Sequence, residues 1–319
     1  MDSTPFLFAD SVCHQLRLEL FDQITQLSSG FWSAVGLVHQ AKRRNLRFLC
    51  AVKGRTVEYR CSDVLNTFDR WASQVEVKDL DLKYDRIVSF ENGEGYAETI
   101  EAPLDDFQRS IFPTVASLVA NCHFGFAERR EDFSASINSM RFVSMGGCEG
   151  QDTCHLIAPQ LEYGTIESIF LRPGDVKPKP EELAELFERF VRSARFHHLS
   201  APGPLPNDYE LHALFLERAL AGELKEEAKI KISNLGFDRR RLYALYPECR
   251  VQKTKKLFWR IPNSNLVVGD ALYFISEDEV ELEIVAEGAF NPARSREPVR
   301  KNVQRPRQLS ASWFFGQIL

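Results

Sequence analysis

The chain has 319 residues, 44% of them hydrophobic and 27% charged, so it is long enough to bury a substantial core. No apolar run approaches the roughly 20 residues that cross a bilayer, which excludes a membrane-spanning protein. The formal net charge of −5 argues against broad nucleic-acid binding.

Apolar residues from Pro5 to Arg44 recur at spacings that mostly fit short amphipathic helices, and we expect two or three of them there. Two β-rich runs follow, Arg47–Val52 and Thr56–Cys61. The glycine at position 54 between these runs predicts a β-hairpin. Between Leu104 and Phe126 the apolar spacing predicts another helix, which Pro113 either begins or bends.

Short β-rich runs then recur at intervals of about 27 to 34 residues, a spacing typical of stacked repeat units. These runs are Met140–Met145, Ile166–Leu171, Arg195–Leu199 and Lys229–Ser233. The helices expected to alternate with them are Asp152–Leu161, Pro180–Arg195 and Asp208–Ala221. Strand–helix–strand order predicts that neighbouring strands are parallel.

Three alternating segments near the end predict antiparallel strands that close the repeat: Lys256–Ile261, Ala271–Ile275 and Val280–Val285. We therefore expect an α/β fold with three parts. A small helical module occupies residues 1–45, a curved, leucine-rich-repeat-like β-α domain residues 46–286, and a basic, flexible tail residues 287–319.

The tail differs in charge from the rest of the chain. From Phe290 onward, six Lys and Arg residues stand against one acidic residue, so this segment carries +5 and the remaining chain −10. Three prolines interrupt any periodicity in it, which favours a solvated tail. Its cations give the chain its one expected means of weak contact with nucleic acid or acidic protein. These cations are Arg294, Arg296, Arg300, Lys301, Arg305 and Arg307.

The seven cysteines are scattered, and no signal-peptide pattern opens the chain, so we expect reduced thiols in the cytoplasm or, alternatively, the nucleus. Cys148, Cys154 and His155 group three potential zinc ligands, and Cys122-His123 supplies two more. Their spacing differs from the close ligand pairs of structural zinc, so we expect ordinary buried thiols and no metal.

Two further polar groups are candidates for chemistry. His197-His198 ends a repeated strand, but no carboxylate or nucleophile lies beside it in sequence. Asp79, Asp81 and Asp85 lack the glycine and distal glutamate of a calcium loop, and we interpret them as a solvated acidic edge. We therefore expect no catalytic residue and no cofactor, and predict a non-enzymatic protein that binds another protein.

The N-terminal helices carry the run Pro5-Phe6-Leu7-Phe8, followed by Val12, Leu16, Leu27 and Trp32. This pattern resembles a degenerate F-box, a small three-helix module. The opening Met1-Asp2-Ser3-Thr4-Pro5-Phe6, followed by Trp32, His39 and Lys42-Arg43-Arg44, is similar to the start of an F-box and F-box-associated family that is much expanded in nematodes. The segment Gln160–Ile169 is similar to the FTH-type repeat of that family.

The resemblance implies a substrate receptor of a cullin-type ubiquitin ligase. Its N-terminal helices would bind a Skp-type adaptor, and its repeat surface would bind an unknown target protein. The residues implied to face or support the adaptor are Pro5, Phe6, Phe8, Val12, Leu16 and Trp32. The chain departs from the family pattern at Phe6 and Phe8, where a typical F-box has a small or acidic residue.

Two alternatives remain open on these residues. In the first, the chain is a stand-alone interaction module of the same family with no ligase association. In the second, the N-terminal apolar residues simply close one end of the repeat.

Overall fold

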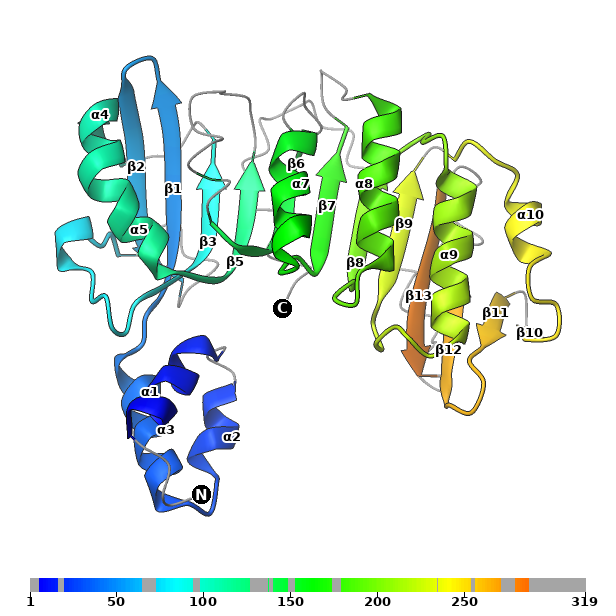
Figure 1. Cartoon of the computed structure of the whole chain (residues 1–319), viewed down its shortest axis with the longest axis horizontal. Coiled ribbons are helices and arrows are strands. Elements are labelled where there is room, and N and C mark those ends of the chain that lie inside the picture. The colour runs from blue at the N-terminus through cyan, green and yellow to red at the C-terminus, as the bar shows by residue number, and fades with distance from the viewer. Residues whose placement is uncertain are drawn as a thin grey trace, which may run out of the picture. The chain divides into compact units, whose positions relative to one another are not determined.

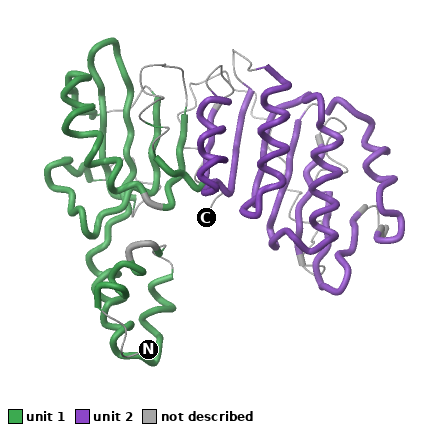
Figure 2. Tube along the Cα trace, viewed as in Figure 1, with its two compact units in different colours: residues 1–143, 311–319 green, residues 144–310 purple. Residues whose placement is uncertain are grey.

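The computed structural model describes most of the chain outside its two ends (Figure 1). The chain divides into two compact units, one with the described residues up to Val143 and one from Ser144 onward (Figure 2). The expected boundary at residue 45 lies within the first unit and stays a prediction, and the expected tail lies outside the described residues. The structure describes residues 6–16, 20–64, 73–93, 98–126, 137, 140–148, 153–173, 179–233, 235–253, 256–270 and 279–286.

Three helices open the first unit and confirm the expected helical module. They are α1 (Phe6–Gln15), α2 (Phe21–Thr25) and α3 (Gly30–Lys42). Apolar side chains from all three helices fill their common core, and Phe21 of α2 is the largest of them. The fully or nearly buried members of this core are Ala9, Cys13, Phe21 and Val35.

The strands of the first unit lie in the order β5-β3-β1-β2-β4. Strands β1 and β2 are the expected antiparallel hairpin, and Gly54 adopts a φ of 63° in its turn, a conformation that favours glycine. Strand β3 pairs parallel with β1 and β5, and β2 pairs antiparallel with β4. Their bounds are β1 (Asn45–Lys53), β2 (Thr56–Asp63), β3 (Arg86–Asn92), β4 (Ile100–Pro103) and β5 (Val119–Phe126).

The helix predicted between Leu104 and Phe126 is wrong in its second half, because it ends at Leu118 and β5 follows directly. Cys122, Phe124 and Phe126 in β5 alternate with a period of two, while Val119, Cys122 and Phe126 also keep helical spacing. A π-helical turn precedes Pro113, which has no N–H to donate to the carbonyl four residues back. The segment runs through α4 (Leu104–Asp106), the π-helical turn (Phe107–Ile111) and α5 (Phe112–Leu118).

An aromatic layer forms the core of the first unit's sheet. The rings of Phe48 and Phe90 on neighbouring strands lie 5.4 Å apart, and those of Phe90 and Phe124 lie 5.9 Å apart. Phe107 covers this layer with its ring 6.3 Å from that of Phe48. The polar side chains of these strands therefore lie on the opposite face of the sheet.

The second unit confirms the strand–helix repeat. Strands β6, β7, β8 and β9 are parallel neighbours, as predicted. Helices α7, α8 and α9 lie side by side over one face of these strands (Figure 1). The repeat consists of β6 (Phe142–Cys148), α7 (Thr153–Tyr163), β7 (Ser168–Arg172), α8 (Pro180–Arg192), β8 (His198–Pro202), α9 (Asp208–Leu220) and β9 (Lys229–Ser233).

Antiparallel strands complete this unit in the order β10-β11-β12-β13-β9, which confirms the predicted C-terminal closure. The strand predicted at Ala271–Ile275 lies outside the described residues, and the strand before β13 is β12. The elements are α10 (Arg239–Tyr243), β10 (Arg250–Lys253), β11 (Lys256–Arg260), β12 (Leu266–Asp270) and β13 (Glu279–Ala286). No described helix combines the length and apolar composition needed to span a bilayer.

Candidate functional site

Close packing of α2 against α3 builds the helical module. A Cβ placed on Gly36 would lie 2.8 Å from the Cγ2 methyl of Ile24, closer than real Cβ contacts allow. Half-buried apolar side chains pack around the core, namely Leu16, Ile24, Phe31 and Trp32. The module therefore has a specific apolar core, and its remaining apolar side chains lie outside it.

Exposed apolar side chains concentrate on this module. Among the described residues, nine large hydrophobic side chains are exposed, and seven of them belong to α1–α3 and the short segments between these helices. The remaining two are Leu82 and Tyr163. A group of this kind on a small module is the usual mark of a protein-interaction surface. The seven, with exposed fractions, are Phe6 (52%), Leu7 (79%), Phe8 (57%), Leu20 (36%), Leu27 (46%), Leu37 (53%) and Val38 (41%).

Ring contacts position the aromatic residues of α1 against α3. The ring of Phe6 meets that of Phe31 edge-on at 6.3 Å, and the ring of Phe8 meets that of Trp32 at 6.4 Å. Phe31 and Trp32 also contact each other edge-on at 6.5 Å. These edge-to-face contacts are favourable, so the exposed rings of α1 have defined positions.

The six residues predicted to contact an adaptor fall into three groups in the structure. Phe6 and Phe8 are exposed and available to a partner. Val12, Leu16 and Trp32 are half-buried, and Leu16 and Trp32 pack against the core of the module. Pro5 lies outside the described residues.

A buried polar pair connects α1 and α3. His39 Nε2 lies 2.8 Å from Asp10 Oδ1, and the imidazole stacks on Phe21 with ring centroids 5.9 Å apart. Burial lowers the pKa of His39, although its hydrogen bond to Asp10 acts in the opposite direction. Lys83 reaches the other carboxylate oxygen of Asp10 at 3.4 Å. The pair thus connects the module to the segment before β3.

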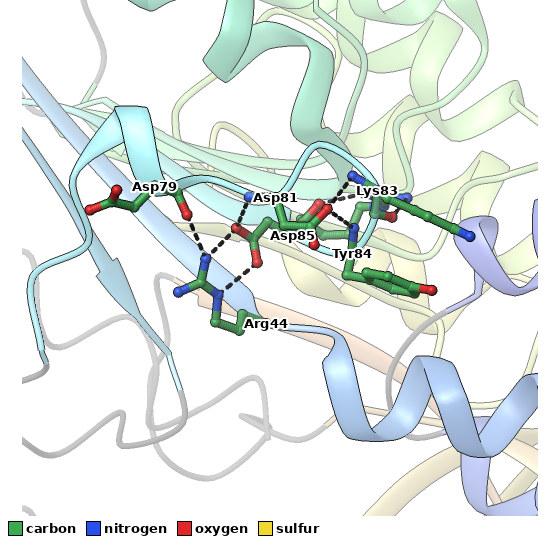
Figure 3. A network of polar contacts seen from close by, with 7 residues as sticks. Arg44, Asp79, Asp81, Lys83, Tyr84 and Asp85 are labelled. Carbon is green, nitrogen blue, oxygen red and sulfur yellow. Dashed lines mark hydrogen bonds and ion pairs between the residues drawn. The ribbon is translucent and has the colours of Figure 1, made fainter.

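That segment is fixed by the polar network in Figure 3. Arg44 Nε donates to Asp85 Oδ1 at 2.8 Å, and its Nη2 donates to Asp85 Oδ2 at 2.6 Å and to the Asp79 carbonyl at 3.2 Å. The backbone N–H of Asp81 donates to Asp85 Oδ2 at 2.7 Å. The Asp85 side chain is fully buried, so all of this charge is compensated within the protein.

The interpretation of Asp79, Asp81 and Asp85 as a solvated acidic edge is wrong for Asp85. Its carboxylate is buried and bound by an arginine that is 41 residues away in sequence. Asp81 shapes a turn instead, because its Oδ1 accepts the backbone N–H groups of Lys83 and Tyr84 at 2.8 and 3.3 Å. These acidic residues therefore stabilise the junction between module and sheet.

Neither of the other polar groups considered in the sequence forms a reactive cluster. The described residues contain no group of three His, Cys, Asp or Glu that would hold a metal ion. His198 packs edge-on against Phe170 with centroids 4.3 Å apart. Burial lowers the pKa of His198 to about 3, with the nearby Lys229 acting in the same direction. The imidazole is therefore neutral at physiological pH.

In the second unit, the face of the strands opposite α7, α8 and α9 carries polar side chains. Pairing registers align His198 with Lys229 and Lys229 with Glu283 across adjacent strands. Lys229 Nζ lies 2.9 Å from Glu281 and 3.5 Å from Glu283. This face is polar, whereas the other face of the same strands is apolar core.

Sequence reasoning missed two parts of the apolar surface. Ala34, Leu37, Val38 and Ala41 form a second apolar stripe on α3 at spacings of three and four, and all four are exposed. That pattern was visible in the sequence. Leu82, which is 62% exposed, had no such signal because it lies in a turn.

No protein-family model, curated protein or solved structure matches the chain when it is compared with each of these groups.

Proposed function

We propose that the chain is a non-enzymatic substrate receptor of a cullin-type ubiquitin ligase. Helices α1–α3 bind a Skp-type adaptor, and the sheet binds a target protein. The chain then acts by proximity, because it keeps the target at high effective concentration near the transferring enzyme. It performs no bond chemistry itself.

The observation that carries this proposal is the distribution of exposed apolar side chains. The described residues expose nine large hydrophobic side chains, and seven of these belong to the helical module, which has about forty residues. Phe6 and Phe8 expose more than half of their side chains while their rings contact α3. Aromatic residues with defined positions are the usual anchors of protein–protein interfaces.

A reducing compartment fits the cysteines. The structure describes the side chains of six cysteines, all of them free, and five of these are buried. We therefore assign the receptor to the cytoplasm or nucleus, where thiols stay reduced.

The direct test is co-expression of the intact chain with a Skp-type adaptor, followed by purification on a tag carried by the chain. A variant with Phe6→Asp and Phe8→Asp places charges on the exposed surface without opening the core, so it should stay folded. Tyr163→Asp is the matched control, because Tyr163 is 43% exposed on α7 in the second unit. We expect the adaptor to co-purify with the wild type and the control but not with the double variant. Failure of the wild type to retain the adaptor would refute the proposal.

The junction network favours a second candidate function, a stand-alone interaction protein. Arg44 and Asp85 integrate the module into the first unit, as expected if its helices mainly close that end of the fold. A truncation that removes residues 1–42 and keeps Arg44 separates the two candidates. If the truncated chain stays folded and loses the adaptor, the ligase function gains support. If the intact chain never binds the adaptor, the stand-alone function is favoured.

A further inference from the structure

Helix α3 carries apolar side chains on its outward face as well as on its inward face. The inward side chains, among them Val35, lie in the core of the module. The outward side chains recur at spacings of three and four and form a stripe about 100° wide, which we call the α3 stripe. All of its members are exposed, namely Ala34, Leu37, Val38 and Ala41. Helices that are apolar on all sides are normally buried, so this stripe has the composition of a contact surface.

Polar side chains beside the α3 stripe have partners within the chain. On one flank, Gln40 Nε2 donates to Asp22 Oδ1 at 2.8 Å. Ser33 Oγ donates to the Thr25 carbonyl at 2.8 Å. The stripe itself contains no charged residue, and Lys42 lies beyond its C-terminal end. A partner that covers the stripe must therefore present an uncharged, apolar face, because a charge buried there would find no mate.

The α3 stripe is open along its length. Leu37 and Val38 at its centre are 53% and 41% exposed. One turn before Ala34, a Cβ placed on Gly30 would meet nothing within 4 Å. The stripe spans about 10 Å from Ala34 to Ala41. Small side chains at both ends allow a facing helix to approach closely.

The order of residues in the α3 stripe is symmetric. Read from either end, the stripe gives a small side chain, two large apolar side chains and a small side chain. When two copies of the stripe meet antiparallel, Ala34 of each copy faces Ala41 of the other. At the centre, Leu37 of each copy then faces Val38 of the other. The stripe is therefore complementary to itself, which is the property that a two-fold contact requires.

We propose that the chain forms a two-fold dimer through the α3 stripe, with the two α3 helices antiparallel and the symmetry axis between Leu37 and Val38. This inference goes beyond the proposed function and does not depend on adaptor binding. A contact between two helices of this length is small, so we expect a dissociation constant on the order of 10–100 μM.

Sedimentation of the purified intact chain at concentrations from about 1 μM to about 500 μM measures this dimer. We expect the wild type to change from monomer to dimer within this range. Leu37→Glu and Val38→Lys should each weaken dimerisation by about tenfold or more, because each places an unpaired charge at the centre of the contact. Tyr163→Asp is the matched control and should dimerise like the wild type, since Tyr163 is 43% exposed on α7.

An equimolar mixture of the two charged variants tests the antiparallel register. In that register, the carboxylate introduced by Leu37→Glu in one copy faces the ammonium introduced by Val38→Lys in the other. The mixture should therefore dimerise more tightly than either variant alone. Both wild-type side chains are exposed, and thermal denaturation verifies that each variant folds. A mixture that dimerises no better than the separate variants would overturn the proposed arrangement.

Other outcomes separate this inference from the proposed function. A wild type that stays monomeric over the whole range, or a dimer that Leu37→Glu does not weaken, would overturn the inference and leave the proposed function intact. If the wild type is monomeric and Leu37→Glu abolishes binding of a Skp-type adaptor, the stripe belongs to the adaptor surface, which also overturns the inference. The variant with Phe6→Asp and Phe8→Asp should lose the adaptor and still dimerise.

Discussion

Arg44 binds the Asp85 carboxylate through two parallel hydrogen bonds, from Nε to Oδ1 at 2.8 Å and from Nη2 to Oδ2 at 2.6 Å. These hydrogen bonds raise the pKa of the Arg44 guanidinium. Arg44 follows α3 by two residues, and Asp85 directly precedes β3. The pair therefore joins the helical module to the first sheet, in the part of the chain proposed to connect adaptor and target.

Removal of this arginine should destabilise the first unit. Arg44→Met leaves the fully buried Asp85 carboxylate without its main partner, so we expect the free energy of unfolding to fall by about 3 kcal/mol. Urea denaturation followed by circular dichroism measures the loss. Lys53→Met is the matched control, because the 2.6 Å pair of Lys53 with Glu58 is solvent-exposed and its removal should change stability by less than about 1 kcal/mol. Equal losses in the two variants would contradict the role of Asp85 at the junction.

A methyl group at position 36 should separate α2 from α3. Gly36→Ala brings a Cβ within 2.8 Å of a branched methyl on Ile24, and we expect a loss of about 1–3 kcal/mol from overpacking. Gly30→Ala in the same helix is the control, since a Cβ there meets nothing within 4 Å. The comparison is made by thermal denaturation. If both variants melt at the same temperature, the close packing of the two helices is wrong.

Acid should destabilise the fold through its buried histidines. Burial lowers the pKa of His39 and His212, and lowers those of His123 and His198 to about 4 and about 3. Above pH 6.5 these groups are neutral in both folded and unfolded chains and contribute no pH dependence. Below pH 6.5 the unfolded chain binds protons that the folded chain does not, so stability falls by up to about 1.4 kcal/mol per pH unit for each histidine.

Urea denaturation between pH 7.5 and pH 5 measures this slope. The variant His123→Gln should show a shallower slope, because it removes one of the groups that only the unfolded chain protonates. A free energy of unfolding that stays constant or rises as the pH falls from 6.5 to 5 would contradict the assignment of these histidines as buried and neutral.

Most described thiols should resist alkylation in the folded protein. Burial raises the pKa of the Cys13, Cys50 and Cys122 thiols, and raises that of Cys61 to about 12, so little reactive thiolate forms at neutral pH. Cys249 is half-exposed. Brief treatment with iodoacetamide and peptide mapping should therefore label Cys249 before these four. Early labelling of Cys50 or Cys61 would show that the β1–β2 hairpin is not packed as described.

Local patterns predicted the repeat of the second unit well. The apolar stripe of α8, with proline at its first position and glutamates in its first turn, predicts a helix that begins at Pro180. In the structure the helix begins there and ends at Arg192, three residues before the predicted end at Arg195. The same method failed for β5, because its first residues continue the spacing of α5. Where a segment fits both the helical period and the period of a strand, its tertiary contacts decide which structure forms. This segment forms a strand because it pairs with β3.

The site was less predictable than the fold. Phe6 and Phe8 were recognisable from a family resemblance, but their exposure depends on how α1 packs against α3. The burial of Asp85 has no local cause, since it follows from the contact with Arg44. The turn around Leu82 is shaped locally by Asp81, but its position against α3 depends on the contact between Tyr84 and His39. Such contacts join residues more than forty positions apart, so a single sequence does not reveal them.

Hydrogen–deuterium exchange of the intact chain, with and without a Skp-type adaptor, tests the central claim most directly. We expect the adaptor to slow amide exchange in α1 and α3, while β8 and β9 exchange at unchanged rates. Unchanged exchange in α1 and α3 at saturating adaptor, or protection confined to the strands of the second unit, would contradict the account.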